Sequence, residues 1–218
     1  MKINWHRRDI SKEEYECAFL NNSVKEAAYK EASDIRKFEI ELFWKRAAFF
    51  WAFIVSIYTA YYHVLTKIYE RKCENGTYYL HGKIPLIVLS GLGLFFCVSW
   101  LLSSRGSKHW QENWENHLML LEDSITGPLH KTYEAGKAFS ETKLTIAAGW
   151  IISICSYGLL LFEFVEFVKR LNNGVVCFFI TCIFALLVFI LLISYSQIVK
   201  GTTSKSGSIK FQTQILDK

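Results

Sequence analysis

Hydrophobic and polar residues along the chain separate into long blocks rather than alternating at short range. Four stretches contain no Asp, Glu, Lys or Arg, namely residues 47–66, 84–104, 144–162 and 174–199. They hold 20, 21, 19 and 26 residues. An apolar helix of about 20 residues is long enough to cross the hydrocarbon core of a bilayer. The pattern therefore predicts an all-α integral membrane protein with four transmembrane helices.

The segments outside these spans are charged, and they complete the expected organisation. We expect a cytoplasmic N-terminal helical arm, a first outer loop, a cytoplasmic helical segment between spans two and three, a second outer loop and a flexible cytoplasmic tail. In chain order these are residues 1–46, 67–83, 105–143, 163–173 and 200–218.

Composition and charge refine this picture. Of the 218 residues 51% are hydrophobic and 21% are charged, with a formal net charge of +5. A water-soluble enzyme or a disordered chain would not need four uncharged blocks of this length. The arm, the middle segment and the tail hold 19 of the 25 Lys and Arg residues. Because cytoplasmic segments carry the excess of positive charge, both termini and the middle segment are predicted to be cytoplasmic.

The arm is predicted to be one long helix from Ser11 to Arg46 that continues into the first span, with Asn21-Asn22-Ser23 as a point where it could weaken locally. Ser11 followed by Glu14 is the spacing of a capping box, in which each side chain binds a backbone N–H group of the other residue. The absence of Pro and Gly after Ser11 favours an unbroken helix.

The middle segment carries the most distinctive polar pattern. A helix is expected from Ser107 to Asp123, with Trp110, Trp114 and His117 on one face. The sequence Thr126-Gly127-Pro128 would end it, and a second helix is expected from Leu129 to Ser140. The aromatic face fits either a partner site or a packed contact within the protein, and packing is the simpler interpretation.

A search for chemistry finds no catalytic motif. The sequence has no nucleophile elbow, no metal-binding Cys/His cluster and no phosphate-binding or dinucleotide-binding loop, so we expect no enzyme activity, no cofactor and no metal. Glu163 and Glu166 follow span three. They fit an acidic ring around an ion pathway in an oligomer, or, more simply, a helix end among the outer headgroups.

Two segments carry a resemblance to known proteins. They are IRKFEIELFWKRA at residues 35–47 and RGSKHWQENWE at residues 105–115, the latter continuing to residue 129. This pattern resembles a family of small bacterial inner-membrane proteins, and it is similar to the transmembrane effectors of anti-phage systems, including retrons.

The resemblance implies a role that composition and spacing do not supply. In retrons a reverse transcriptase with its RNA–DNA product holds the effector inactive until infection. The chain would then be an inner-membrane toxin in contact with the lipid bilayer, able to form a homo-oligomer and not expected to bind nucleic acid directly. Residues expected to form the cytoplasmic coupling or partner surface are Arg36, Lys37, Trp110, Asn113, Trp114 and His117.

Two other functions remain open from the sequence. One is a non-toxic membrane scaffold or assembly factor, which needs only an exposed arm and middle segment. The other is a small passive channel, because uncharged spans argue against proton-coupled transport but not against a pore.

Overall fold

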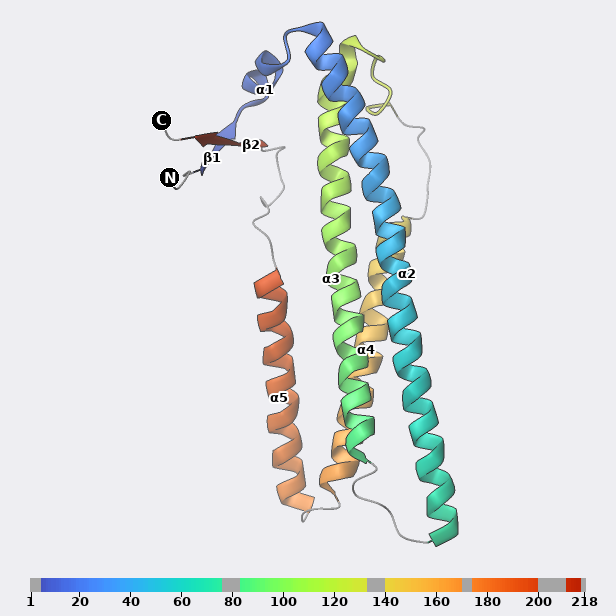
Figure 1. Cartoon of the computed structure of the whole chain (residues 1–218). Helices are drawn as coiled ribbons and strands as arrows, with labels where there is room; N and C mark the ends of the chain where they lie inside the picture. The colour runs from blue at the N-terminus through green and yellow to red at the C-terminus, as the bar shows by residue number, and fades with distance from the viewer. Residues whose placement is uncertain (1–4, 76–82, 133–139, 170–173, 200–210, 217–218) are drawn as a thin grey trace. The chain divides into compact units, whose positions relative to one another are not determined.

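The computed structural model describes residues 5–75, 83–132, 140–169, 174–199 and 211–216. It divides the chain into two compact units. Unit 1 comprises residues 1–41, 108–137 and 201–218, and unit 2 comprises residues 42–107 and 138–200. Within the described residues the fold is all-α apart from one pair of short strands (Figure 1).

The elements follow one another as β1, α1, α2, α3, α4, α5 and β2. Their bounds are Trp5–Ile10, Lys12–Ala18, Asn22–Asn75, Lys83–Leu121, Glu141–Val168, Gly174–Val199 and Phe211–Leu216. The boundary between the two units lies inside α2 and again inside α3, so each of these two helices contributes residues to both units.

In unit 1 the predicted N-terminal helix is interrupted. The capping box forms as expected, with Ser11 and Glu14 each binding the backbone of the other. However, α1 ends at Ala18 and α2 begins at Asn22, so the prediction of one helix from Ser11 is wrong. The physical reason is a new cap. The Asn21 side chain accepts hydrogen bonds from the Ser23 N–H group (3.0 Å) and hydroxyl (2.7 Å), which starts a second helix.

The continuation of the arm into the first span is confirmed, since α2 runs without a break from Asn22 to Asn75. The expected middle-segment helix is also present, as the last part of α3. A single 3₁₀ turn, Glu122–Ser124, follows α3, and Gly127 then adopts a φ of 70°, which favours glycine. The predicted second helix does not begin at Leu129, because residues 129–131 form turns, and residues 133–139 lie outside the described residues.

Strands β1 and β2 pair antiparallel, with Trp5 opposite Leu216 and Ile10 opposite Phe211. This pairing joins the two ends of the described chain and was not predicted from the sequence. The expectation of a flexible tail is therefore wrong for residues 211–216, and residues 200–210 lie outside the described residues.

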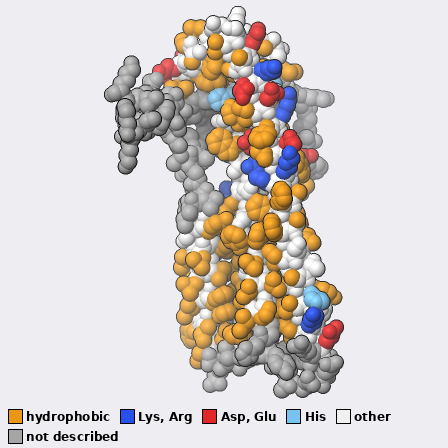
Figure 2. All heavy atoms as spheres, viewed as in Figure 1, with side chains coloured by type: hydrophobic (Ala, Val, Ile, Leu, Met, Phe, Trp, Pro, Cys, Tyr) orange, Lys and Arg blue, Asp and Glu red, His pale blue; other side chains and the backbone are white. Residues whose placement is uncertain are grey.

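Among the described residues, four helices are long and apolar enough to cross a membrane, and their uncharged blocks lie in unit 2. Each predicted span lies within one of them, and α5 has the predicted bounds of span four, 174–199. The predicted outer loops are shorter than expected, because α2 continues to Asn75 and α4 to Val168. Figure 2 shows hydrophobic side chains over most of the visible face of these helices within unit 2.

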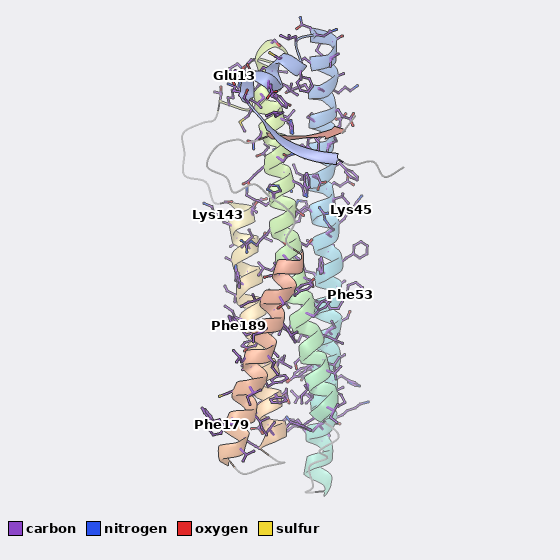
Figure 3. All side chains as sticks on the ribbon, turned by 90° about the vertical axis from the view of Figure 1, so that its left-hand side faces the viewer. Glu13, Lys45, Phe53, Lys143, Phe179 and Phe189 are labelled. Atoms are coloured by element: carbon purple, nitrogen blue, oxygen red, sulfur yellow. The ribbon has the colours of Figure 1, made fainter. Side chains whose placement is uncertain are left out.

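The interior of unit 2 lies among α2, α3 and α4. Its buried apolar cluster is Ile54, Cys97 and Trp100, with Tyr58 and Ile152 packed against it. Helix α5 presents mainly exposed apolar residues, and Phe179 and Phe189 point outward from it (Figure 3).

Candidate functional site

Among the described residues, two groups of interacting side chains connect helices that are far apart in the sequence, one in each unit. We call Tyr15, Arg36, Trp114, Glu115 and His117 in unit 1 the coupling cluster. We call Tyr58, Tyr61, Lys83, Ser156 and Glu163 in unit 2 the polar seam.

The coupling cluster begins with a contact between α1 and α3. The Tyr15 hydroxyl lies 2.7 Å from Nδ1 of His117, and the Trp114 ring packs on His117 with centroids 5.4 Å apart. Burial raises the pKa of Tyr15 to about 12 and lowers the pKa of His117 below its usual value. At neutral pH the contact is therefore between two uncharged groups, which suits a buried position.

The second contact of the coupling cluster joins α2 to α3. Arg36 donates to Glu115 Oε1 from Nη2 at 2.8 Å and from Nε at 3.2 Å. Both side chains remain about a third exposed, so water screens the pair and its contribution is about 0.2–1 kcal/mol. The pair therefore gives α2 and α3 an oriented contact, and breaking it costs little free energy.

The other predicted coupling residues differ in their surroundings. Within the described part of the chain, Lys37 pairs with Asp34 on its own helix, 3.3 Å away. Trp110 is 52% exposed, and Asn113 is half-buried. The aromatic face of α3 thus divides into a packed end at Trp114 and His117 and an exposed end at Trp110.

Glu122 was not among the predicted site residues. Its side chain binds the backbone of the turn that follows α3. Its carboxylate is fully buried and accepts the backbone N–H groups of His130 at 2.6 Å and Lys131 at 3.2 Å, and it lies 2.9 Å from Nδ1 of His130. Burial raises the pKa of Glu122, but the hydrogen bonds from His130 and Lys131 outweigh it and leave the pKa below the usual value. The carboxylate therefore stays ionised and closes the loop at Gly127.

The centre of the polar seam is Glu163 on α4. Its Oε1 accepts the Tyr61 hydroxyl of α2 at 2.6 Å, and its Oε2 accepts Nζ of Lys83 on α3 at 2.8 Å. The side chains of Lys83 and Glu163 are 8% and 1% exposed. One carboxylate thus joins three helices, in an environment where an unpaired charge is costly.

A second set of seam contacts connects the same three helices. The Tyr58 hydroxyl of α2 donates to Ser156 Oγ of α4 at 2.5 Å, and this oxygen lies 3.4 Å from the Cys97 sulfur of α3. The contact depends on Gly93, because a Cβ atom there would lie 2.7 Å from the Tyr58 hydroxyl oxygen. Small residues at helix contacts in membranes allow such close approach.

The structure changes the interpretation of the two candidate acidic residues. Glu163 is enclosed within its own chain, so it does not lie at an exposed surface where a ring between copies would need it. It is also not a headgroup-facing residue. Glu166 is partly exposed, 3.3 Å from Lys169, and its role in a ring stays a prediction.

An apolar groove of about 320 Å³ lies between α3, α4 and α5. It is lined by Gly91, Leu94, Phe95, Val98, Leu160, Val188, Leu191, Leu192 and Tyr195. The Tyr195 hydroxyl is the one polar side-chain group in its lining, so the groove lacks the side chains of a catalytic or metal site.

The partners that the sequence did not reveal are Tyr15, Tyr58, Tyr61, Lys83, Glu115, Ser156 and His130. One sequence signal was available in retrospect. Gly149, Ser153, Ser156, Leu160 and Glu163 recur every three or four residues in α4 and are all buried there. This spacing marks the face of α4 that contacts other helices.

A protein-family model matches well over half of the chain. The model of a family described as octameric membrane protein family (8xMP) matches residues 26–165. The matched range contains α3 and most of α2 and α4, and it ends before α5. A search of curated proteins and a search of solved structures each find no match.

Proposed function

We propose that this chain, which belongs to the octameric membrane protein family (8xMP), is the membrane effector, or toxin, of a bacterial antiviral abortive-infection system of the retron type. A sensor partner, a reverse transcriptase with its RNA–DNA product, holds it inactive. On phage infection the chain assembles as a homo-oligomer and disrupts the integrity of the inner membrane.

The observation that carries this proposal is the continuity of α2 and α3. Each is a single helix that includes residues of the coupling cluster and also a membrane span. A helix transmits rotation or translation along its length without needing a hinge. Binding or release of a partner at unit 1 therefore reaches the spans through the backbone itself.

The Arg36–Glu115 pair is the contact through which a partner would act. It joins the two shared helices, it is partly exposed, and it is weak enough to be replaced by contacts to another protein. Trp110, more than half exposed on the same stretch of α3, supplies an aromatic anchor of the kind that protein interfaces favour.

The proposal includes a topology. Both termini and unit 1 are cytoplasmic, since 19 of the 25 Lys and Arg residues lie in the arm, the middle segment and the tail. It assigns no catalytic step to the chain and no direct contact to nucleic acid. The effect on the cell is a change in membrane permeability.

The test compares cells that carry this chain with and without its neighbouring genes, with a voltage-sensitive dye reporting membrane potential during phage infection. We expect depolarisation before lysis only when the complete set of genes is present. Normal polarisation in infected, dying cells would contradict the proposal. A stable membrane complex in uninfected cells with no depolarisation under any trigger would favour a scaffold instead.

A charge exchange tests the coupling step. Arg36→Glu should uncouple depolarisation from infection, because it places two carboxylates together at the α2–α3 contact, and Arg36→Glu with Glu115→Arg should restore it. Lys37→Glu is the matched control, because Lys37 contacts only its own helix in the described structure. Equal effects of Arg36→Glu and Lys37→Glu would rule out a specific role for this pair.

A further inference from the structure

Helix α2 has two opposite sides within its membrane span. Ile54, Tyr58 and Tyr61 are buried or half-buried among α3 and α4. Ser56, Thr59 and His63 are exposed, and exposed apolar side chains flank them on both sides, Phe49 and Phe53 on one and Trp51 and Val55 on the other. At 3.6 residues per turn, these polar residues and Ala52 fall within a sector about 60° wide around the axis of α2, and this sector lies opposite the buried side. We call Ala52, Ser56, Thr59 and His63 the polar face of α2.

The other spanning helices have no such face in the described part of unit 2. The exposed residues of α3 between 84 and 104 are Ile84, Pro85, Val88, Leu92 and Phe95, and all are apolar. On α4, exposed residues between 144 and 162 are apolar or Gly, including Ile151, Ile154 and Cys155. The exposed residues of α5 are apolar from Val176 to Ile193, and Ser194 is near its end. The polar face of α2 is therefore not a general property of these helices.

The chemistry of this face fits water better than lipid. Ser56 and Thr59 donate to the carbonyls of Ala52 and Val55 at 2.8 Å, which satisfies their hydroxyl protons but leaves their oxygen lone pairs available. His63 adds an imidazole, which requires hydrogen-bond partners in either protonation state. Polar side chains at membrane depth usually face a bundle interior or a water-filled cavity.

From this contrast we propose that the polar face of α2 lines a water-filled lumen at the centre of a ring of copies, through which small hydrated ions pass. In a closed ring of eight, the number that the family description names, the polar face of each copy would supply one eighth of the lumen wall. The apolar outer surfaces of α4 and α5 then face lipid. This inference rests on the proposed oligomeric function and adds which residues contact the ions.

Thiol accessibility tests the lumen directly. Cysteines are introduced singly as Ser56→Cys, Thr59→Cys and His63→Cys in a chain whose Cys17 and Cys73 are replaced by Ser, and membranes are treated with a charged, membrane-impermeant thiosulfonate before and during infection. Native Cys155 and Cys182, exposed on α4 and α5, are internal controls in every sample. Because the reactive species is the thiolate, which forms in water but not in lipid, we expect the introduced thiols to react at least about tenfold faster than these controls in one state.

The outcomes separate this inference from the proposed function. Labelling no faster than Cys155 and Cys182 in both states, with reactivity restored after denaturation in detergent, overturns the lumen even if infected cells depolarise. Fast labelling without any depolarisation supports the lumen and counts against the toxin.

A second measurement uses ion flux from vesicles that contain the purified oligomer. Thr59→Trp should reduce flux at least about tenfold, since one bulky ring per copy fills a narrow lumen. Ile154→Trp makes the same change in size on the exposed side of α4 and should leave flux within about twofold. Equal reduction by both variants overturns the assignment of the lumen to α2.

Discussion

Helices α4 and α5 are neighbours in unit 2, but their contacts with the other helices differ in kind. Helix α4 uses Ser156 and Glu163 to bind α2 and α3 through hydrogen bonds and an ion pair. Helix α5 packs on α4 through ring stacking, with the Phe184 and Phe164 centroids 3.7 Å apart, and through the Tyr157 hydroxyl of α4, which donates to the Ala185 carbonyl at 3.0 Å. Its Tyr195 hydroxyl lies 3.0 Å from Ser99 Oγ of α3. It also lies beyond the matched family region. Polar contacts therefore define the three-helix core, and α5 is an addition to it.

The difference has a physical basis. In a bilayer, apolar surface gains little by leaving lipid for protein, so hydrogen bonds and close packing are needed to fix one arrangement of helices. The three-helix core has the hydrogen bonds and the ion pair, whereas the mainly apolar contact of α5 with α3 and α4 leaves the groove of about 320 Å³. The following predictions test whether α2, α3 and α4 form the specific core and α5 the adaptable part.

The largest loss of stability is expected from Glu163→Ala. It leaves the buried Lys83 ammonium unpaired, which should cost about 3–5 kcal/mol of unfolding free energy. Unfolding of the purified protein in mixed micelles, followed by tryptophan fluorescence, measures it. Glu166→Ala, which removes a partly exposed pair with Lys169, is the control and should cost under about 1 kcal/mol. Replacing both Lys83 and Glu163 by Met should recover most of the loss, and failure to do so would argue against the ion pair as the cause.

A smaller effect is expected from Gly93→Ala. The added Cβ meets the Tyr58 ring and displaces its hydroxyl from Ser156, which should cost about 1–3 kcal/mol. Gly158→Ala is matched to it, since both glycines are inside helices and nothing lies within 4 Å of a Cβ at position 158. Thermal unfolding of the two variants gives the comparison, and equal melting temperatures would mean that Tyr58 does not require the close approach.

A still smaller effect is expected at the contact of α5. Phe184→Ala removes the stacked pair with Phe164 and should cost about 0.5–1.5 kcal/mol beyond the loss of side-chain area. Phe179→Ala, on the exposed side of α5, is the control for the same truncation. A loss as large as that of Glu163→Ala would place α5 in the core and break the comparison.

The smallest effect is expected from Tyr195→Phe. It removes only the hydroxyl that lies 3.0 Å from Ser99 Oγ, a neutral contact worth about 0.5–1 kcal/mol in membrane helices. Limited proteolysis or amide exchange over α5 should show modestly faster opening, with α3 and α4 unchanged. Equal acceleration in all three helices would mean that α5 opens together with the core.

The spans were predictable from the sequence, whereas their contacts were not. Uncharged blocks such as 174–199 can be recognised from the order of the residues alone, because the thickness of the bilayer sets the length of helix that can cross it. The rotation of each helix depends on residues far apart in the chain. Lys83 was assigned to a loop and Glu163 to an outer helix end, because nothing in either local pattern indicates a partner about 80 positions away.

Unit 1 illustrates the same limit at shorter range. The capping box at Ser11 is a local motif and was predictable. The break before Asn22 depends on Asn21 capping a helix that could equally have continued, a competition between two local states that packing decides. Of the predicted coupling residues, Arg36 and His117 make contacts between helices, but their partners Glu115 and Tyr15 were identified only in the structure.

The Lys83–Glu163 pair also has a consequence for how the protein is made. Chain order means that α3 is synthesised, and enters the bilayer, before the ribosome has reached Glu163. During that interval the Lys83 ammonium must extend to the headgroups at the end of its helix. Arrival of α4 then supplies the carboxylate and fixes the lysine among three helices. The ion pair therefore works as a late step of membrane insertion, and a chain truncated before residue 163 cannot complete it.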